Sequence, residues 1–369
     1  MNADNSFERI LIVGVGLIGG SLGLALKRKG FAGEIIGVDE QTALDIALQR
    51  KVIDRGFRRE ELHQATRQAD LIFLCTPIAE TLRLLATIGK DLQPGTLITD
   101  VGSTKRQIVE AAKIHLPADV DFIGGHPMAG SEFRGVEAAD PFLFENTTYV
   151  LTPSRPTHFR MQRAFGELLE RIGAKVLLLL PELHDEIAAA VSHLPQMLAV
   201  SLMHLVASRQ DESPYFLKMA AGGFRDMTRI ASSPYGIWED IIRTNSDMIV
   251  RYIDDYIEEL HKLKLCLHEQ CLAEYFDKAA KNRLSIPKDT KGFLQPHYDL
   301  LIGVEDKPGV IAGISNALSE RQINIKDIEV LKIRENEGGT MRLAFSSRED
   351  RDQAATILRQ VGFDVRTRE

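Results

Sequence analysis

The chain has 369 residues, of which 44% are hydrophobic and 26% are charged, and its formal net charge is −7. This length predicts two or three domains with sizeable cores, and the composition is that of an ordinary globular protein. The negative charge argues against a general nucleic-acid-binding protein, which would show a basic surface. The three cysteines, Cys75, Cys266 and Cys271, predict neither a disulfide framework nor a metal site, which suits a reducing cytosol. The N-terminus is polar and no apolar run approaches about 18 residues, so we expect neither a signal peptide nor a membrane span.

The first predicted elements are a strand, a glycine turn, a helix and a second strand. The apolar run 9–13 is followed at once by a G-x-G-x-x-G sequence and then by a helical pattern to about residue 29. In this motif the glycines permit a tight turn, close approach of a pyrophosphate and close packing of the helix. An acidic residue at the end of the second strand accepts hydrogen bonds from a ribose diol. The predicted cofactor-binding residues are Gly14, Gly16, Leu17, Ile18, Gly19 and Asp39.

Asp39 also predicts which dinucleotide binds. A 2′-phosphate would lie against its carboxylate and that of Glu40, and no Arg or Lys occurs between Asp39 and Arg50. We therefore predict NAD rather than NADP as the cofactor. The alternative is a glycine-rich turn that binds no nucleotide, but the flanking strand, helix and acid are the context that supports the motif.

Further elements complete an α/β domain up to about residue 180. The strand that ends at Cys75, Thr76 and Pro77 reaches the same sheet edge as the glycine turn, so these residues are candidates to line the cofactor site. For Cys75, a small buried apolar residue is the favoured interpretation. The other predicted strands are 96–101, 120–123, 149–151 and 175–178, with helices between them.

The strand at 120–123 leads into a glycine-rich loop that contains His126. This edge of a doubly wound sheet is where ligands bind. A neutral imidazole there can take a proton from an alcohol as hydride leaves for a nicotinamide, and the alternative is a histidine in a surface loop. Ser103 follows the strand at 96–101, where it can cap the next helix and also make a functional hydrogen bond.

From residue 181 the apolar spacing becomes wholly helical, with segments at 182–209 and 238–280. Pro195 should kink the first segment or begin a new helix. Such helices bury their apolar stripes by bundling and by pairing with a second subunit.

Between these helical segments, Arg225 and Arg229 lie four residues apart. On a helix they would face one side and could clasp carboxylates. The alternative is a solvated basic face with Asp226 as a local partner.

A polar linker at 286–296 precedes elements in the order βαββαβ, which is the ferredoxin-like arrangement. The predicted fold class is therefore α/β with three domains. They are an N-terminal Rossmann-type dinucleotide-binding domain (1–180), an all-α helical middle domain (181–285) and a C-terminal ferredoxin-like βαββαβ domain (297–369).

Together these segments resemble the prephenate dehydrogenase family of tyrosine biosynthesis, in its bacterial form with a C-terminal ACT domain. The resemblance covers nearly the whole chain. It implies NAD-dependent oxidative decarboxylation of prephenate to 4-hydroxyphenylpyruvate, CO2 and NADH by a cytoplasmic homodimer. The motifs that carry it are Gly14–Gly19, Asp100–Lys105, Gly124–Gly130, Ser192–Pro195 and Gly223–Ala231, with Asp306–Val310 and Ile323–Ile325 for the ACT domain.

The resemblance also implies roles for single residues. His126 would act as the catalytic base, Ser103 would position it, and Arg229 would bind the ring carboxylate. Arg225 stands where some relatives carry Lys. The planar guanidinium group of Arg is not equivalent to the compact ammonium group of Lys. Three further residues, His193, Arg225 and Trp238, would lie around the substrate. Glu132 and Asp226 would be ionic groups that gate the site.

The ACT domain implies amino-acid binding, with feedback inhibition by L-tyrosine. Asp306, Gly309 and Val310 would offer backbone N–H groups at a helix start to the carboxylate, and Asn324 would meet the ammonium group. One alternative is an ACT domain that only strengthens the dimer. For the whole chain, the alternatives are an arogenate or cyclohexadienyl dehydrogenase, or a non-catalytic amino-acid-sensing regulatory protein.

Overall fold

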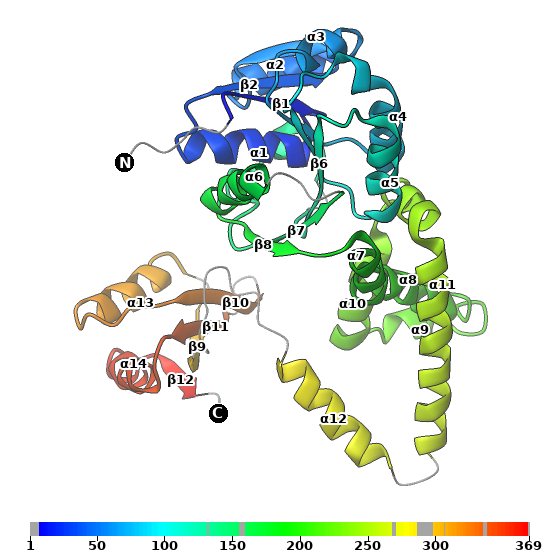
Figure 1. Ribbon diagram of the computed structural model, residues 1–369. Coiled ribbons are helices and arrows are strands. Elements are labelled where there is room, and N and C mark those ends of the chain that lie inside the picture. The colour runs from blue at the N-terminus through cyan, green and yellow to red at the C-terminus, as the bar shows by residue number, and fades with distance from the viewer. Residues whose placement is uncertain are drawn as a thin grey trace. The chain divides into compact units, whose positions relative to one another are not determined.

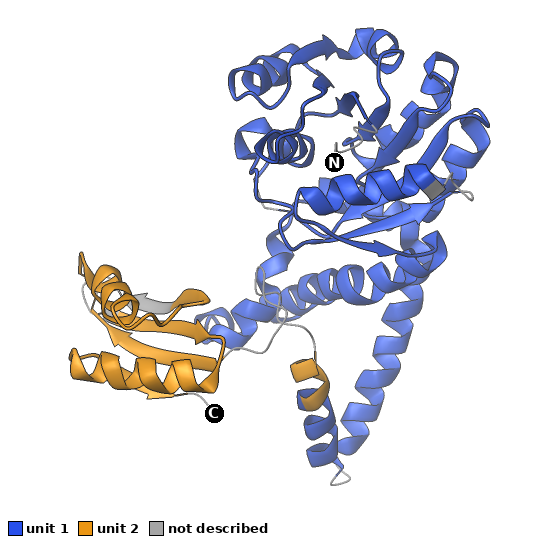
Figure 2. Cartoon of the chain, turned by 60° about the vertical axis from the view of Figure 1, so that its left-hand side comes forward, with its two compact units in different colours: residues 1–280 blue, residues 281–369 orange. Residues whose placement is uncertain are grey.

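The computed structural model describes residues 7–130, 133–154, 159–267, 271–285, 298–305, 307–334 and 338–367. The chain divides into two compact units, residues 1–280 and residues 281–369 (Figure 2). The first unit contains a large mixed sheet and a set of helices. The second contains the last residues of α12 and a small antiparallel sheet with two helices.

The first unit is built on an eight-stranded sheet in the order β3-β2-β1-β4-β5-β6-β7-β8 (Figure 1). All neighbouring strands pair in parallel except β6 and β7. The order reverses between β1 and β4, and ligands bind outside the carboxyl ends of strands at such a switch point. The strands are β1 Arg9–Val13, β2 Glu34–Asp39, β3 Arg55–Arg58, β4 Leu71–Leu74, β5 Leu97–Asp100, β6 Asp121–Pro127, β7 Thr148–Pro153 and β8 Lys175–Leu178.

Helices cover both faces of this sheet. The helices α1 Leu17–Arg28, α2 Gln41–Gln49 and α6 Phe159–Arg171 contribute to one apolar core. The helices α3 Leu62–Thr66, α4 Ile78–Ile88 and α5 Arg106–His115 contribute to a second core. The central strands are apolar on both sides, because a parallel sheet between two helix layers exposes neither face to water.

The sheet differs from the sequence prediction in two places. The prediction lacks β3 and α3. Strand β3, Arg55–Arg58, is a short edge strand with an arginine at each end and offers no apolar run. Strand β6 continues through Pro127, so His126 lies within a strand rather than in a loop. The reason is the partner strand, since His126 pairs with Val150 of β7.

The described residues between 181 and 285 form helices joined by short turns. The sequence predicts a continuous helical run over 238–280, but α11 ends at Cys266 and α12 begins at Leu272. Pro195 lies in the first turn of α8, so a new helix begins there, which is one of the two outcomes that the sequence predicts. A π-helical turn precedes it. The elements are α7 Pro181–Ala188, the π turn Ala189–His193, α8 Leu194–Ala207, α9 Tyr215–Lys218, α10 Gly222–Thr228, the 3₁₀ turn Arg229–Ser232, α11 Tyr235–Cys266 and α12 Leu272–Ser285.

By length and composition alone, the helical stretch Pro181–Ala207 is apolar enough to cross a membrane, so the expectation that no run is long enough is wrong. The core helix of a soluble protein can pass the same test. Within this stretch His184, Asp185 and His193 are buried against other parts of the first unit. Ionisable groups are costly in lipid, so we interpret the stretch as a helix of the folded unit.

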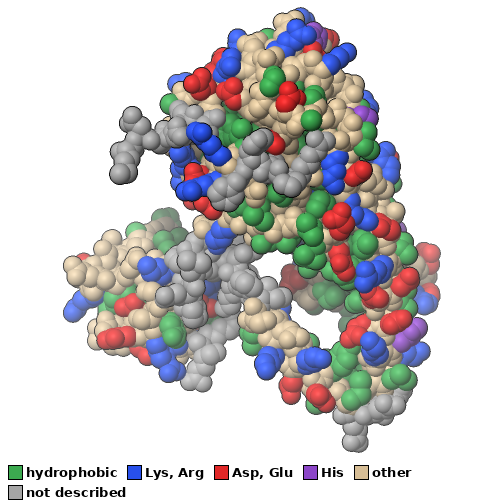
Figure 3. Space-filling view, in the orientation of Figure 1, with side chains coloured by type: hydrophobic (Ala, Val, Ile, Leu, Met, Phe, Trp, Pro, Cys, Tyr) green, Lys and Arg blue, Asp and Glu red, His purple; other side chains and the backbone are tan. Residues whose placement is uncertain are grey.

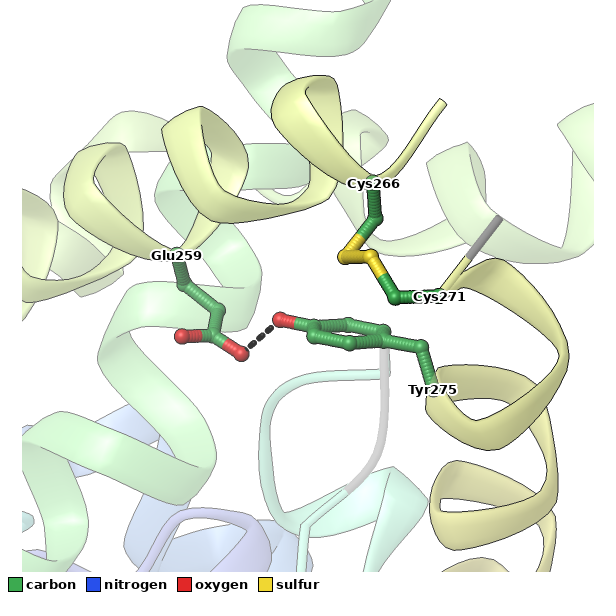
Figure 4. Close-up of a disulfide and its surroundings, with 4 residues drawn as sticks. All are labelled: Glu259, Cys266, Cys271 and Tyr275. Carbon is green, nitrogen blue, oxygen red and sulfur yellow. Dashed lines mark hydrogen bonds between the residues drawn. A yellow bond between two sulfur atoms is a disulfide. The ribbon is translucent and has the colours of Figure 1, made fainter. Parts of the chain in front are cut away.

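A disulfide joins Cys266 and Cys271 across the turn between α11 and α12 (Figure 4). The Cα atoms lie 5.2 Å apart, which is within the usual range for such a bridge. Beside it, Tyr275 donates a hydrogen bond to Glu259. The prediction of no disulfide is therefore wrong, because the end of α11 and the residue before α12 lie close enough for a bridge.

The second unit has the predicted βαββαβ order. Its antiparallel sheet runs β10-β11-β9-β12. Both helices pack on it through a core that includes Leu300, Ile314, Leu343 and Leu358. The elements are β9 Tyr298–Val304, α13 Val310–Ser319, β10 Asp327–Arg334, β11 Gly338–Phe345, α14 Arg348–Gln360 and β12 Asp364–Thr367.

Candidate active site

A cavity of about 460 Å³ lies at the switch point of the large sheet. A Cβ at Gly14, where φ is +93°, would lie 2.5 Å from the carbonyl oxygen of Cys75, so this position requires glycine. A Cβ at Gly16 would meet nothing within 4 Å, which leaves the turn open to a dinucleotide. A Cβ at Gly19 would lie 2.2 Å from the carbonyl oxygen of Gly14, so Gly19 lets α1 pack closely. Six residues predicted for the cofactor site line this cavity: Gly14, Gly16, Asp39, Cys75, Thr76 and Pro77.

The remaining two predicted cofactor residues, Leu17 and Ile18, form the first turn of α1. The Cys75 side chain is half-buried, whereas the sequence favours a fully buried one. Burial raises the pKa of its thiol, and the nearby charge of Asp100 raises it further. The thiol is therefore neutral and contributes surface rather than charge to the cavity.

The carboxylate of Asp39 is held from three sides at the end of β2. Its Oδ2 accepts the backbone N–H of Val15 at 2.8 Å, and its Oδ1 accepts that of Glu40 at 2.8 Å. Arg59 donates to Oδ1 from Nη2 at 3.1 Å and pairs with Glu40 at 3.3 Å. The sequence does not predict the contact with Arg59, because this arginine is twenty residues after Asp39. The unpredicted strand β3 pairs with β2 and brings Arg59 next to Asp39.

A buried ion pair holds the backbone that carries His126. Lys105 and Asp100 are both fully buried and paired, and Nζ of Lys105 also donates to the carbonyl oxygen of Gly125 at 2.6 Å. Asp100 Oδ1 accepts the N–H of Gly125 at 3.1 Å. A Cβ at Gly125 would lie 2.5 Å from the Asp100 carbonyl oxygen, so only glycine permits this approach. Burial lowers the pKa of Lys105, and the charge of Asp100 opposes that shift.

His126 is buried near the end of β6, with 9% of its surface exposed. Burial lowers the pKa of this ring well below its usual value, and His184, Lys105 and His193 lower it further. The imidazole is therefore neutral near pH 7, which is the state that a general base requires.

The ring of His126 contacts helix α7. Its Nδ1 lies 2.8 Å from Nε2 of His184, and Nδ1 of His184 lies 2.8 Å from Oδ1 of Asp185. All three side chains are buried. Sequence reasoning missed His184 and Asp185. The available signal was two adjacent polar residues inside the apolar spacing of the helix predicted at 182–209.

The structure corrects the capping role expected for Ser103. Helix α5 begins at Arg106, and its first-turn backbone N–H groups at Lys105 and Arg106 donate to the Asp185 carboxylate at 2.6 and 2.9 Å. Ser103 lies too far ahead of the first turn to compete with that carboxylate. It stays in the β5–α5 turn, and its hydroxyl has no hydrogen bond with the residues that the structure describes.

His193 and Trp238 lie together, as expected for residues around one site, with ring centroids 6.0 Å apart and edge to face. Burial lowers the pKa of His193 to about 4, although Asp185 opposes the shift, so this ring is also neutral. On the same helix as Trp238, Asp240 accepts the N–H of Ala79 at 2.8 Å, at the start of α4. Helix α11 thereby joins the helical segments to the cofactor half of the unit.

Arg225 lies in α10, and Arg229 begins the 3₁₀ turn that follows it. Both are exposed, as is Asp226, and none of the three forms an ion pair within the described part of the chain. The turn is tied to α8 by Gln196, whose Nε2 donates to the carbonyl oxygen of Ile230 at 3.1 Å. Two guanidinium groups therefore remain available to an anionic ligand. Glu132, the other predicted gating residue, lies outside the described residues.

In the second unit, Gly309 begins α13 with φ at +92°, a conformation that favours glycine, and Val310 is the first helical residue. Asn324 is exposed, just ahead of β10, and Asp306 lies outside the described residues. Across the described residues of both units, no group of three or more His, Cys, Asp or Glu side chains could hold a metal ion.

Comparison with known proteins decides the family. Over 356 residues the chain is 38% identical to the prephenate dehydrogenase of Bacillus subtilis (strain 168), an alignment that covers 95% of each protein. This chain belongs to the prephenate dehydrogenase family. Family models match residues 22–178 (prephenate dehydrogenase, nucleotide-binding domain), 180–280 (prephenate dehydrogenase, dimerization domain) and 298–363 (ACT domain). The predicted family and fold class are confirmed.

Two solved dehydrogenase structures are similar to about three quarters of this chain. The A. aeolicus prephenate dehydrogenase in complex with hydroxyphenyl propionate and NAD+ has a TM-score of 0.70 and 31% identity, over 76% of this chain and 98% of that one. The arogenate dehydrogenase of Synechocystis has a TM-score of 0.67 and 32% identity, over 74% of this chain and 98% of that one. The NAD+ in the A. aeolicus complex agrees with the cofactor predicted from Asp39.

Proposed function

We propose that this chain catalyses the NAD-dependent oxidative decarboxylation of prephenate to 4-hydroxyphenylpyruvate, CO2 and NADH, as a cytoplasmic enzyme of L-tyrosine biosynthesis. The observation that carries the proposal is the buried, neutral His126 on the same sheet as the dinucleotide cavity. Residues 1–180 form the cofactor domain, residues 181–285 the substrate and dimer domain, and residues 297–369 the ACT domain, joined by the linker 286–296. Family membership supports this assignment.

In this reaction, His126 accepts the proton of the substrate's C4 hydroxyl, and Ser103 helps to position that hydroxyl. NAD supplies the acceptor for the hydride that leaves C4. The bond to the ring carboxyl group then breaks, its electron pair enters the ring and places negative charge on the C4 oxygen, and CO2 leaves as the ring becomes aromatic. That oxygen takes the proton back from His126 and becomes the hydroxyl group of 4-hydroxyphenylpyruvate. Arg229 holds the ring carboxylate before this step, because an arginine fork pairs with a carboxylate in a fixed geometry.

Other residues shape the site around that reaction. His193 and Trp238 lie beside the substrate, Arg225 contributes a second cation, and Asp226 with Glu132 gates the entrance. The turn at Gly16 would hold the cofactor's pyrophosphate, since a Cβ there would meet nothing within 4 Å. The carboxylate of Asp39, at the end of β2, would hold the cofactor's ribose diol.

The direct test is an assay of the purified chain with prephenate and NAD+, in which NADH absorbance and 4-hydroxyphenylpyruvate are measured. We expect both products to form in equal amounts. A parallel assay with arogenate tests the second candidate, an arogenate or cyclohexadienyl dehydrogenase, which the similarity to the Synechocystis enzyme favours. If neither substrate yields NADH, the enzyme proposal is wrong and a non-catalytic amino-acid sensor becomes the better reading.

We also infer that the chain forms a homodimer through its helical segments. Large apolar side chains reach the surface there (Figure 3), and Leu180, Val191, Leu205, Met219 and Tyr235 are 61–81% exposed. A group of large exposed apolar side chains is typical of an interaction surface, and the family model that matches residues 180–280 is a dimerization domain. Light scattering after gel filtration should give twice the 41.2 kDa of one chain. A particle of single-chain mass would contradict the inference.

The second unit is proposed to bind L-tyrosine and to inhibit the enzyme when it does so. The match to an ACT domain and the left-handed Gly309 at the start of α13 support a carboxylate site there. Initial rates should fall as L-tyrosine is added and should not fall with equal L-alanine. Asn324→Ala should weaken that inhibition while the uninhibited rate is unchanged. Rates that do not respond to L-tyrosine would favour an ACT domain that only strengthens the dimer.

A further inference from the structure

We infer that His184 is a positioning residue for the base. In this proposal Asp185, His184 and His126 form a chain of hydrogen bonds that keeps a proton on Nδ1 of His126 and leaves the lone pair on its Nε2. The role of His126 as a base rests on the proposed function. The hydrogen bonds and the tautomer that they fix do not depend on it.

The chain begins at a carboxylate that can only accept hydrogen bonds. Asp185 is fully buried, and it accepts the backbone N–H groups of Lys105 and Arg106. The guanidinium Nε of Arg106 also donates to it at 3.3 Å. Burial by itself would raise the pKa of Asp185, but hydrogen bonds from His184 and these amides leave it below its usual value. The group is therefore an anion, and its charge is already paired with Arg106.

An anionic acceptor fixes the proton on the next ring. Because the Asp185 carboxylate has no proton to give, the 2.8 Å contact with His184 requires a proton on Nδ1 of His184. In a neutral His184 the lone pair then lies on Nε2, which is an acceptor. The 2.8 Å contact between the two rings then requires a proton on Nδ1 of His126. A neutral imidazole carries one proton, so the lone pair of His126 lies on Nε2.

This arrangement matters when the proton arrives. The hydroxyl proton moves to Nε2 of His126, the ring becomes a cation, and its Nδ1–H donates more strongly to His184. The carboxylate of Asp185 stabilises that charge through the intervening ring without accepting a proton itself, as a buried carboxylate does for a catalytic imidazole in other enzymes. Without His184 the ring of His126 would be free to turn or to adopt the other tautomer.

The same contacts join the two halves of the first unit. His126 is on β6, whereas His184 and Asp185 are on α7, and Asp185 docks α7 onto the first turn of α5. The base is therefore complete only when the helical segments are packed against the sheet. Among the described residues, the other charged or titratable groups that face these rings are Lys105 with its partner Asp100, and His193 from the π turn.

The first test compares two substitutions at one position. His184→Phe keeps a ring but removes the acceptor, so kcat should fall about a hundredfold, with KM for prephenate within about threefold of the original. His184→Gln keeps an acceptor oxygen near the position of Nε2, so kcat should recover to within about tenfold. His115→Phe, an exposed histidine on α5, is the control and should leave kcat unchanged. A normal kcat in His184→Phe, or equal losses in the Phe and Gln variants, would overturn the inference.

The second test uses the unsubstituted protein and does not require it to be active. Histidines are labelled with ¹⁵N in the intact protein with NAD+, and long-range proton–nitrogen spectra report which ring nitrogen of each histidine is protonated. We expect the Nδ1–H form for both His184 and His126 at pH 7. The Nε2–H form of His126 would overturn the inference. If the protein does not oxidise prephenate, the proposed function fails, but this spectrum still decides the tautomer.

Discussion

The carboxylate of Asp185 accepts the backbone N–H of Lys105 at 2.6 Å, so a side chain from α7 caps the first turn of α5. The cap is supplied by a residue 80 positions away rather than by the local Ser103. The second oxygen of the same carboxylate accepts the N–H of Arg106 at 2.9 Å. One buried group thus satisfies two unpaired helix amides and also contacts the histidine beside His126.

Asp185→Asn should destabilise the protein. Both carboxylate oxygens accept hydrogen bonds, and an amide can place an acceptor in only one of those positions, so a buried donor loses its partner. We expect the free energy of unfolding, measured in urea, to fall by about 2–3 kcal/mol. Asp247→Asn is the control, because Asp247 is exposed and pairs with the same Arg106, and its loss should be below about 1 kcal/mol. Equal effects of the two substitutions would contradict the capping role.

His126→Asn should lower kcat by about 10²–10⁴-fold while KM for prephenate stays within a few-fold, because the base is lost but the carboxylate contacts remain. Steady-state kinetics with purified variant and parent enzyme provide the comparison. A substituted enzyme that turns over at a near-normal rate would exclude the histidine as the base.

The pH dependence of the parent enzyme tests the same residue. Since the pKa of His126 is lowered well below 6.5, its neutral form persists as the pH falls through that value. We expect kcat/KM to stay level from pH 8 to 6.5 and to decline only at lower pH. The profile is measured with stability checked at each pH. An acidic limb centred at pH 7 or above would show that the ring is not neutral in the free enzyme.

The cofactor half of the site could be predicted from the sequence because it is local. The turn at Gly14, the open position at Gly16 and the acid at Asp39 belong to one strand–helix–strand segment. At Gly14 and Gly19 a Cβ would clash with backbone, whereas at Gly16 the space is open. The ferredoxin-like order of the second unit follows from local periodicity in the same way.

The contacts that the sequence did not predict are those between distant segments. Arg59 reaches Asp39 only because the edge strand β3 pairs with β2, and that strand has no apolar pattern. His184 reaches His126 across 58 residues, through a helix that packs on another helix. The spacing of apolar residues indicates which face of a helix or strand is buried, but it does not indicate which other helix or strand packs against that face.

Arg229→Ala should raise KM for prephenate by about ten- to a hundredfold, with a smaller change in kcat, because a bound carboxylate would lose its charged partner. Arg225→Ala should raise KM less, since Arg225 is the second cation of the pair. Arg209→Ala is a control, as that exposed arginine pairs with Glu212 at 2.6 Å, and its KM should match the parent. An Arg229→Ala enzyme with unchanged KM would remove this residue from the substrate site.

Asp39→Asn should relax the choice of cofactor. In the parent chain the carboxylates of Asp39 and Glu40 repel a 2′-phosphate and also occupy the guanidinium of Arg59. With one carboxylate removed, Arg59 becomes free to pair with the phosphate, so kcat/KM for NADP+ should rise about tenfold or more while that for NAD+ falls. The double substitution Asp39→Asn with Arg59→Ala should lose the gain for NADP+ but keep the fall for NAD+. If both enzymes gain NADP+ activity equally, repulsion by Asp39 is the whole effect and Arg59 takes no part in cofactor choice.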